Sequence, residues 1–192
     1  MNKKTGILFT LCVMLTINLF AQEQDKKNII GFGAGISPGK DYCIYLGDPV
    51  DEWASKNVSP VFQVFYARQA LPAIKLGGYF EYEHTTVNNL YNFDDTKASR
   101  FSMGLNWLAQ YPNKAFHAQL GGYIGCGSII ASKWDKALNG IDFGIMIGPA
   151  YEKDNIGIAL HIQSGLGWYG SSDLDDLILL MPKILLKVYH KF

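Results

Sequence analysis

The sequence has few cysteines, no surplus of charge of either sign and no long hydrophobic run beyond its N-terminus. Its 192 residues contain 17 Lys and Arg against 17 Asp and Glu, so no basic excess would attract the phosphates of a nucleic acid. No later segment approaches the ~18 consecutive apolar residues of a membrane-spanning helix. We therefore expect neither a nucleic-acid-binding protein nor a bundle of membrane helices.

The three cysteines carry no motif of known chemistry. Cys12 lies in an N-terminal apolar stretch, and neither Cys43 nor Cys126 has the Cys-x-x-Cys or His-x-x-x-His spacing of a metal site. An exported chain can form a disulfide. We nevertheless expect Cys43, in a long loop, and Cys126, near the outer end of a strand, to stay unpaired. We expect no metal and no cofactor.

The N-terminus has the layout of a secretory signal peptide. Lys3 and Lys4 precede a nearly unbroken apolar stretch, residues 7–20, which ends in Leu19-Phe20-Ala21 before a polar segment. This layout predicts cleavage after Ala21. The stretch is shorter than the roughly 20 residues needed to cross a bilayer, which disfavours a retained anchor helix. We expect a signal peptide over residues 1–21 and a single domain over residues 22–192.

Apolar and polar residues alternate along most of the remaining chain, which predicts β-strands. In residues 73–84, for example, Leu76 and Phe80 share one face, opposite Lys75 and Glu81. Segments 29–37 and 61–69 are more continuously apolar, so their alternation does not show clearly which residues face inward and which face outward. The pattern predicts eight strands, at 29–37, 61–69, 73–84, 99–110, 115–127, 141–151, 155–169 and 177–192.

The connections between these segments alternate in length. Residues 70–72, 112–114 and 152–154 are tight turns punctuated by Pro, Asn or Asp. Longer excursions cover residues 38–60, 85–98, 128–140 and 170–176. Short turns on one side and long loops on the other are typical of outer-membrane β-barrels. An even number of strands would leave both ends of the mature chain on the short-turn side.

Alternation alone also fits a soluble lipocalin-like barrel, whose apolar face would turn inward. Three features favour lipid outside. The polar face is rich in glycine, which suits a crowded interior. Unpaired strand edges in hydrocarbon would cost several kcal/mol per lost hydrogen bond, so the sheet has to close. The apolar face ends in two aromatic girdles: Tyr66, Tyr111, Phe116, Tyr151 and Phe192 near the turns, and Tyr82, Phe101 and Trp168 near the loops.

With these features the chain resembles the small eight-stranded outer-membrane β-barrels of Gram-negative bacteria, of the OmpA transmembrane-domain or OmpX type. The resemblance covers residues 29–192 and includes the C-terminal Lys187-Val188-Tyr189-His190-Lys191-Phe192, whose last residue resembles the signal read by the barrel-assembly machinery. It implies an all-β, closed, antiparallel, up-and-down transmembrane barrel. Two positions depart from the pattern. His190 stands where an outward aromatic is more usual, and Pro182 should produce a bulge or kink in the last strand.

An eight-stranded barrel has an interior only wide enough for its own side chains. Its inward polar residues could form a substrate or proton path, or a self-satisfying network in which buried charges pair because unpaired ones are costly. We expect the network, with Lys75 paired to a glutamate across the lumen. Its predicted members are Lys75, Glu81, Glu83, His117, Asp142, His161, Lys183 and Lys187.

Some small outer-membrane barrels modify lipid A and need a nucleophile beside a base near the outer leaflet. In His161-Ile162-Gln163-Ser164 the histidine and the serine fall on opposite faces of one strand. His84 lies near an outer strand end with no serine-plus-acid set evident beside it, and His190 lies at the wrong end. We therefore expect no catalytic residue and no enzyme.

The first two long loops combine aromatic with acidic residues, and external contacts concentrate on loops. The candidate contact residues are Tyr42, Tyr45, Trp53, Tyr91 and Phe93. We expect a monomeric outer-membrane protein with a structural or surface-interaction role. Its expected partners are membrane lipid and lipopolysaccharide and, during insertion, the barrel-assembly machinery. The alternatives are a lipid A-modifying enzyme, a narrow porin-like conduit and a component of a secretion apparatus.

Overall fold

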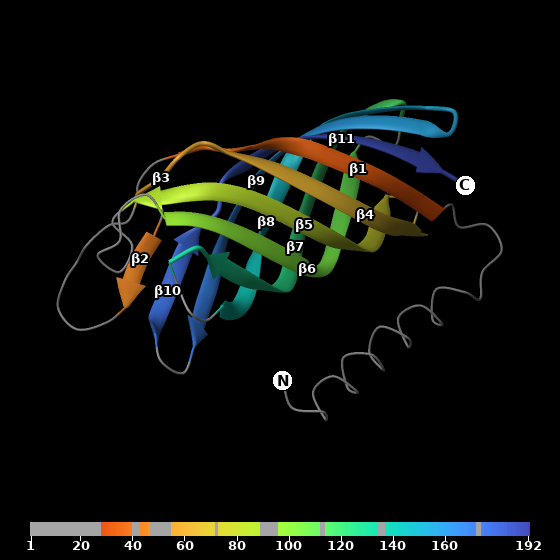
Figure 1. The fold of residues 1–192 in the computed structure, drawn as a ribbon. Coiled ribbons are helices and arrows are strands. Elements are labelled where there is room, and N and C mark those ends of the chain that lie inside the picture. The colour runs from red at the N-terminus through yellow and green to blue at the C-terminus, as the bar shows by residue number, and fades with distance from the viewer. Residues whose placement is uncertain are drawn as a thin grey trace.

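In the computed structural model the chain forms one antiparallel sheet that closes on itself (Figure 1). The structure describes residues 28–39, 43–46, 55–71, 73–88, 96–111, 114–133, 137–171 and 174–192. Within these ranges no helix is long and apolar enough to cross a membrane. The closed ring has eight strands: β1 (Asn28–Ser37), β4 (Ser59–Leu71), β5 (Ile74–Asn88), β6 (Thr96–Tyr111), β7 (Phe116–Ala131), β8 (Leu138–Lys153), β9 (Ile156–Ser171) and β11 (Lys183–Lys191).

Each strand of the ring pairs with two neighbours, in the order β1-β4-β5-β6-β7-β8-β9-β11 and back to β1. The closing pair joins β1 to β11, with Ile29 opposite Lys191 and Ile36 opposite Ile184. Such a ring leaves no strand edge in hydrocarbon, where an unpaired backbone group would be costly. The prediction of a closed, all-β, up-and-down barrel of eight strands is confirmed.

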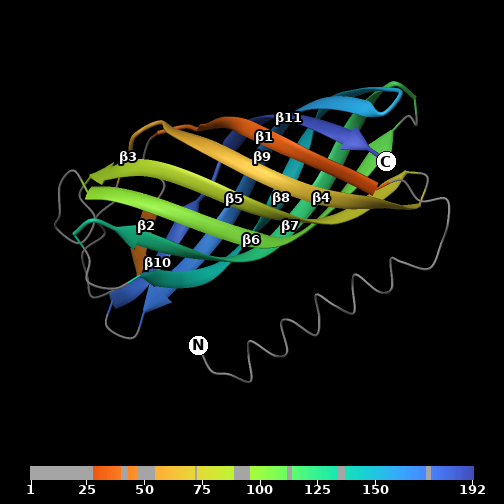
Figure 2. The same cartoon turned by 45° about the vertical axis from the view of Figure 1, so that its right-hand side comes forward.

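The start of β1 and the C-terminus of the chain lie side by side at one end of the barrel (Figure 2). The Asn28 amide donates to the Phe192 carbonyl, and the Phe192 amide donates to the Asn28 carbonyl, each at 2.8 Å. One of the tight turns at this end is Asp154-Asn155, in which Asp154 takes a positive φ of 54°, a conformation that Asp adopts more readily than most residues. We call this end the turn side and the opposite end the loop side.

The strands run further toward the loop side than their alternation predicted. β5 and β6 continue into the segment predicted as a loop at 85–98, and their main-chain pairing persists as far as Val87 opposite Thr96. β7 and β8 likewise continue into 128–140. On the turn side, Glu152 belongs to β8 instead of the turn predicted at 152–154. These extensions matter because they bring additional side chains to the inner face.

The predicted last strand is divided at Pro182. β10 (Leu174–Leu180) ends before Met181 and Pro182, and β11 begins after them, because proline has no amide hydrogen to continue the ladder. The expected irregularity is therefore confirmed. β10 pairs with β9 and with β2 (Cys43–Leu46), while β3 (Ser55–Lys56) pairs with β5. β2 and β3, within the first long excursion, were not predicted because segments so short show no usable alternation.

A belt of apolar side chains covers the outer surface of the barrel. Exposed residues such as Leu105, Ile145 and Leu186 would be unfavourable in water but suit hydrocarbon. The aromatic residues predicted near the turns are all exposed, and near the loops Phe101 and Trp168 are exposed while Tyr82 is half-buried. Interfacial aromatics of this kind typically flank a membrane span.

Beyond this belt, on the loop side, the wall reverses its polarity. Most outward side chains become polar, as at His84, Lys97 and Asn139, while Ile130 stays apolar and exposed. The inward side chains become apolar and form a buried cluster: Val87, Ala98, Ile129, Ala131, Leu138, Tyr169 and Leu177. A wall that passes from lipid into water requires such a reversal, because the apolar face must then turn away from solvent. We call this part the loop-side extension.

Inside the belt, four large aromatic side chains fill the middle of the barrel. We call Phe65, Tyr79, Tyr123 and Tyr189 the aromatic layer. Tyr79 and Tyr123 meet edge to face with ring centroids 5.9 Å apart, and Phe65 and Tyr189 do so at 6.1 Å. The absence of a side chain at glycine positions leaves space for these rings, because a Cβ at Gly157 would overlap the Tyr189 ring. Inward glycines therefore provide space that the aromatic rings occupy.

Candidate functional site: the barrel interior

Arg100 of β6 is the centre of a buried charge cluster between the aromatic layer and the loop-side extension. Its Nη1 lies 2.8 Å from Asp142 Oδ2 and its Nη2 lies 3.3 Å from Glu83 Oε2. The same guanidinium also contacts Glu81. A planar guanidinium with five donors suits such a set better than a lysine would, and it gathers carboxylates from two strands, β5 and β8.

Two lysines complete this loop-side charge cluster. Lys183 of β11 contacts Glu81, and Lys56 of β3 lies 2.7 Å from Glu83. Hydroxyl groups satisfy further carboxylate oxygens: Ser59 donates to Glu83 at 2.6 Å, and Ser102 and Tyr169 donate to Asp142 at 3.0 and 3.2 Å. Three cations thus face three carboxylates, so the cluster is electrically balanced.

A second cluster lies on the turn side of the aromatic layer and is built around Glu152. Lys75 and Lys191 both contact this carboxylate, and the Tyr189 hydroxyl donates to it at 2.6 Å. Lys187 lies in the same half, with its Nζ 5.2 Å from the centre of the Phe65 ring. Three lysines therefore accompany one glutamate here, so the turn-side cluster has more basic than acidic side chains.

His117, Gln119 and His161 extend the turn-side cluster as a chain of hydrogen bonds. His117 Nδ1 lies 2.9 Å from the Lys114 carbonyl, and its Nε2 lies 3.1 Å from Gln119 Nε2. Gln119 Oε1 in turn lies 2.8 Å from His161 Nε2. The chain leads from the turn-side surface to the middle of the barrel.

The structure places all eight residues of the predicted interior network in the lumen, each at most 3% exposed. It brings them together as two groups instead of one network. Glu81, Glu83, Asp142 and Lys183 meet on the loop side, whereas Lys75, His117, His161 and Lys187 lie on the turn side. The glutamate partner expected for Lys75 is Glu152, on a strand across the lumen.

Sequence reasoning missed Arg100, Glu152 and Lys56. Arg100 shares its face with Ser102 and Asn106, so the alternation of the strand could have identified it as inward. Glu152 was assigned to a turn because Lys153 and Asp154 follow it. Lys56 belongs to a strand of two residues, and no periodicity can reveal its direction.

The predicted loop contacts fall outside what the structure describes. Tyr42, Trp53, Tyr91 and Phe93 are not among the described residues, and of Tyr45 only the backbone, in β2, is described. Cys126 is a free thiol on the outward face of β7, as expected. In the described part of the chain no group of three His, Cys, Asp or Glu side chains could hold a metal ion.

One serine–histidine contact lies on the outer wall near the loop side. His84 of β5 and Ser99 of β6 are opposite each other in the ladder, with Nδ1 and Oγ 3.0 Å apart. The Tyr82 hydroxyl is 3.5 Å from the same Oγ. Among the described residues no carboxylate contacts His84. As predicted, His161 points inward and Ser164 outward.

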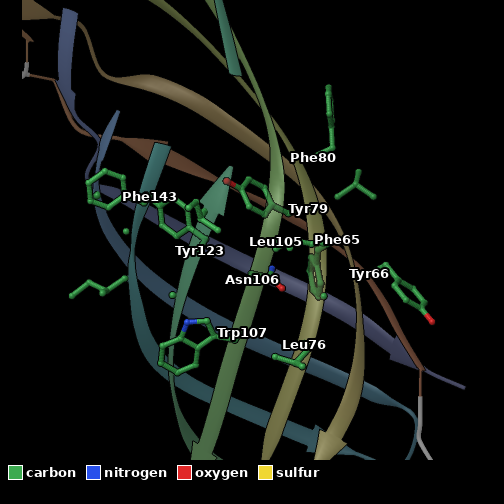
Figure 3. Close-up of a pocket in the computed structure, with 18 of the residues that line it drawn as sticks. Phe65, Tyr66, Leu76, Tyr79, Phe80, Leu105, Asn106, Trp107, Tyr123 and Phe143 are labelled. Atoms are coloured by element: carbon green, nitrogen blue, oxygen red, sulfur yellow. The ribbon is translucent and has the colours of Figure 1, made fainter. Parts of the chain in front are cut away.

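A hollow of about 1290 Å³ follows the barrel wall along β1 and β4 to β10 (Figure 3). Its lining includes the outward Phe80, Leu105 and Trp107 as well as Tyr79 and Tyr123 of the aromatic layer. Figure 3 shows these two tyrosines turned toward each other, with Tyr66 pointing away from them. Its lining is mostly apolar, and its polar members Asn28, Arg68, Asn106 and Ser164 include both outward and inward side chains.

No family model and no curated protein matches the chain. Among solved structures, it is similar to Neisserial surface protein A, with a TM-score of 0.58 and 12% identity over 88% of this chain and 100% of that one. It is also similar to the outer membrane protein OprG from Pseudomonas aeruginosa, with a TM-score of 0.58 and 10% identity over 86% of this chain and 95% of that one. The chain therefore has the fold of small outer-membrane β-barrel proteins.

Proposed function

We propose that the protein is a monomeric barrel of the outer membrane that serves a structural or surface-interaction role. The observation that carries this proposal is the reversal of the wall, from an apolar belt around a polar lumen to a polar extension around an apolar cluster. A rigid part in lipid would thus support a part in water, on which the loops are mounted. External contacts would fall to loop residues such as Tyr42, Tyr45, Trp53, Tyr91 and Phe93.

The packed lumen argues against a conduit. The loop-side charge cluster and the aromatic layer both cross the interior, and opening a path would separate buried ion pairs at a cost of several kcal/mol. We expect no single-channel conductance from the purified protein in planar bilayers. Stable ion currents well above those of protein-free bilayers would refute this part of the proposal.

Lipid and lipopolysaccharide are the partners that the outer surface favours. Above the apolar belt, Lys97, His84 and Ser99 lie outward where phosphate-bearing headgroups would meet the wall, while Phe101 remains in the belt below them. Export by a signal peptide over residues 1–21, and insertion by the assembly machinery through the terminal Phe192, complete the proposal. Mass spectrometry of the mature N-terminus tests the predicted cleavage after Ala21.

An orientation experiment tests the proposal as a whole. In a background with Cys43 and Cys126 replaced by serine, Lys133→Cys on the loop side and Lys153→Cys on the turn side are treated with a membrane-impermeant maleimide. We expect labelling of position 133 in intact cells and labelling of position 153 only after lysis. The protein should also fractionate with the outer membrane and migrate differently in gels before and after heating. Labelling of both sites in intact cells, or recovery without detergent, would refute the proposal.

The contact between Ser99 and His84 favours a second candidate function, an esterase acting on membrane lipid. The Oγ–Nδ1 distance of 3.0 Å is within the range of a nucleophile and its base. Against it, no carboxylate orients His84 among the described residues. A comparison of the lipid A acyl patterns of cells with the wild-type chain and of cells with Ser99→Ala distinguishes the two candidate functions. Ser128→Ala is the matched control, since Ser128 also points outward near the loop side and bonds Asn139. The structural role predicts identical acyl patterns in all three.

A further inference from the structure

A small cavity of about 10 Å³ lies in the turn-side half of the lumen. This is about the room that one water molecule needs. Its lining includes Phe65, Lys75, Gln119, His161, Lys187 and Tyr189. We propose that it is a binding site for a single buried water molecule, which accepts a hydrogen bond from Lys187 and donates one to His161.

The hydrogen-bond chain through Gln119 determines which nitrogen of His161 carries a proton. The Lys114 carbonyl can only accept, so His117 Nδ1 must be the protonated nitrogen of that ring. His117 Nε2 then accepts from the Gln119 amide group at 3.1 Å. Gln119 Oε1 is left as an acceptor, and His161 Nε2 must donate to it at 2.8 Å. The nearest carboxylate to His117, that of Glu152, is 3.9 Å away and too far to alter this assignment.

His161 Nδ1 is consequently an acceptor that needs a donor. His161 is 1% exposed, and its Nδ1 has no hydrogen-bond partner within the described part of the protein. Of the described side chains with such a buried atom, His161 is the one that lines this cavity. Leaving a buried acceptor unsatisfied costs about 1–3 kcal/mol, which favours a ligand that can donate.

Lys187, which lines the same cavity, needs a ligand that can accept a hydrogen bond. Its side-chain nitrogen carries protons that it can donate whether or not it is charged, it is 2% exposed, and no carboxylate of the described residues forms an ion pair with it. The ligand must therefore accept from Lys187 and donate to His161. Water does both. A chloride ion would suit the surplus of lysines but cannot donate to Nδ1, so the donor–acceptor pattern selects water.

The water molecule would explain how the turn-side cluster tolerates more lysines than carboxylates. Instead of an anion, Lys187 would have one retained molecule of solvent and the face of the Phe65 ring. It would also join Lys187 to the chain through His161, Gln119 and His117. The hydrogen bonding of this half would then run without a break from the turn-side surface to the middle of the barrel.

A crystal structure of the mature wild-type chain, grown with sodium bromide, tests the site directly. We expect a solvent peak at hydrogen-bonding distance from both His161 Nδ1 and Lys187 Nζ, without anomalous signal from bromide. A bromide peak at this position, or the absence of any peak in well-ordered density, would overturn the proposal.

Nitrogen NMR of the imidazole groups offers an independent test in detergent micelles. For His161 we expect a protonated Nε2 and an unprotonated, hydrogen-bonded Nδ1. In Lys187→Met the Nδ1 resonance should shift toward that of a free acceptor, whereas Lys191→Met, which removes a lysine bound to Glu152, should leave it in place. A protonated Nδ1 in the wild type, or equal shifts in the two variants, would contradict the water site.

Discussion

The two charge clusters inside this barrel are built on different principles. On the loop side, three cations face three carboxylates around Arg100, and hydroxyl groups satisfy oxygens of Glu83 and Asp142. On the turn side, Glu152 serves two lysines, while Lys187 lies over an aromatic ring. A closed barrel can therefore fill its lumen either with matched charges or with a surplus of lysines, one of which lies over an aromatic ring.

The aromatic layer keeps the two clusters apart. Tyr79 and Tyr123 pack against each other between them, so the charges of one cluster do not pair with those of the other among the described residues. Because the clusters are separate, each can be perturbed without breaking its counterpart. The following changes test this, with stability measured as urea-induced unfolding of the protein in phospholipid vesicles.

Arg100→Met should have the largest effect. It leaves Glu81, Glu83 and Asp142 with less positive charge than negative in a buried site, and removing one partner from such a set costs about 3–5 kcal/mol. The control is Lys97→Met, on the outward face of the same strand, for which we expect a change within about 0.5 kcal/mol. Equal losses in the two variants would show that the loop-side cluster contributes no more than the surface.

Glu152→Gln should have the next largest effect. The amide keeps the size of the side chain but leaves Lys75 and Lys191 without their common carboxylate, and hydrogen bonds to charged groups contribute about 1.5–3 kcal/mol. We expect a loss of about 2 kcal/mol in the free energy of unfolding. Lys153→Met, at the neighbouring exposed position, serves as the control. An unchanged unfolding midpoint in Glu152→Gln would argue that this carboxylate is not the centre of the turn-side cluster.

Lys187→Met should change stability little, by less than about 1 kcal/mol in either direction, because no ion pair is lost and an apolar side chain of similar length replaces a buried cation. Lys183→Met provides the contrast, since Lys183 contacts Glu81 and its removal should cost several times more. Similar losses in the two variants would mean that the excess lysine is as tightly paired as the matched one.

The combination of Arg100→Met with Glu152→Gln tests the separation of the clusters, and its expected coupling energy is the smallest quantity in this series. Sites without shared partners usually add within about 0.3–0.5 kcal/mol. We therefore expect the losses in unfolding free energy of the two single variants to add up to the loss in the double variant. A coupling above about 1 kcal/mol would reveal an electrostatic connection across the aromatic layer.

Much of the fold was predictable because alternation carries the information directly. The period of two assigned Lys75, Glu81 and His161 to the lumen and Phe80, Leu105 and Ile162 to the outer surface. Pro182 predicted the break in the last strand. Val61 and Phe65 were harder to assign, because they are apolar and yet inward. The place of Phe65 depends on an inward glycine of β1, Gly31, where a Cβ would overlap the Phe65 ring.

The alternation in the sequence is enough to assign residues to the lumen, since a strand sends successive side chains to opposite faces. Which of these residues meet follows from the closed barrel alone. Partners such as Lys75 and Glu152, or Arg100 and Asp142, lie on strands that are not neighbours in the ring, and their heights in the barrel depend on strand register and tilt. Register and tilt are set when all eight strands close into the ring, so the sequence of one strand does not specify them.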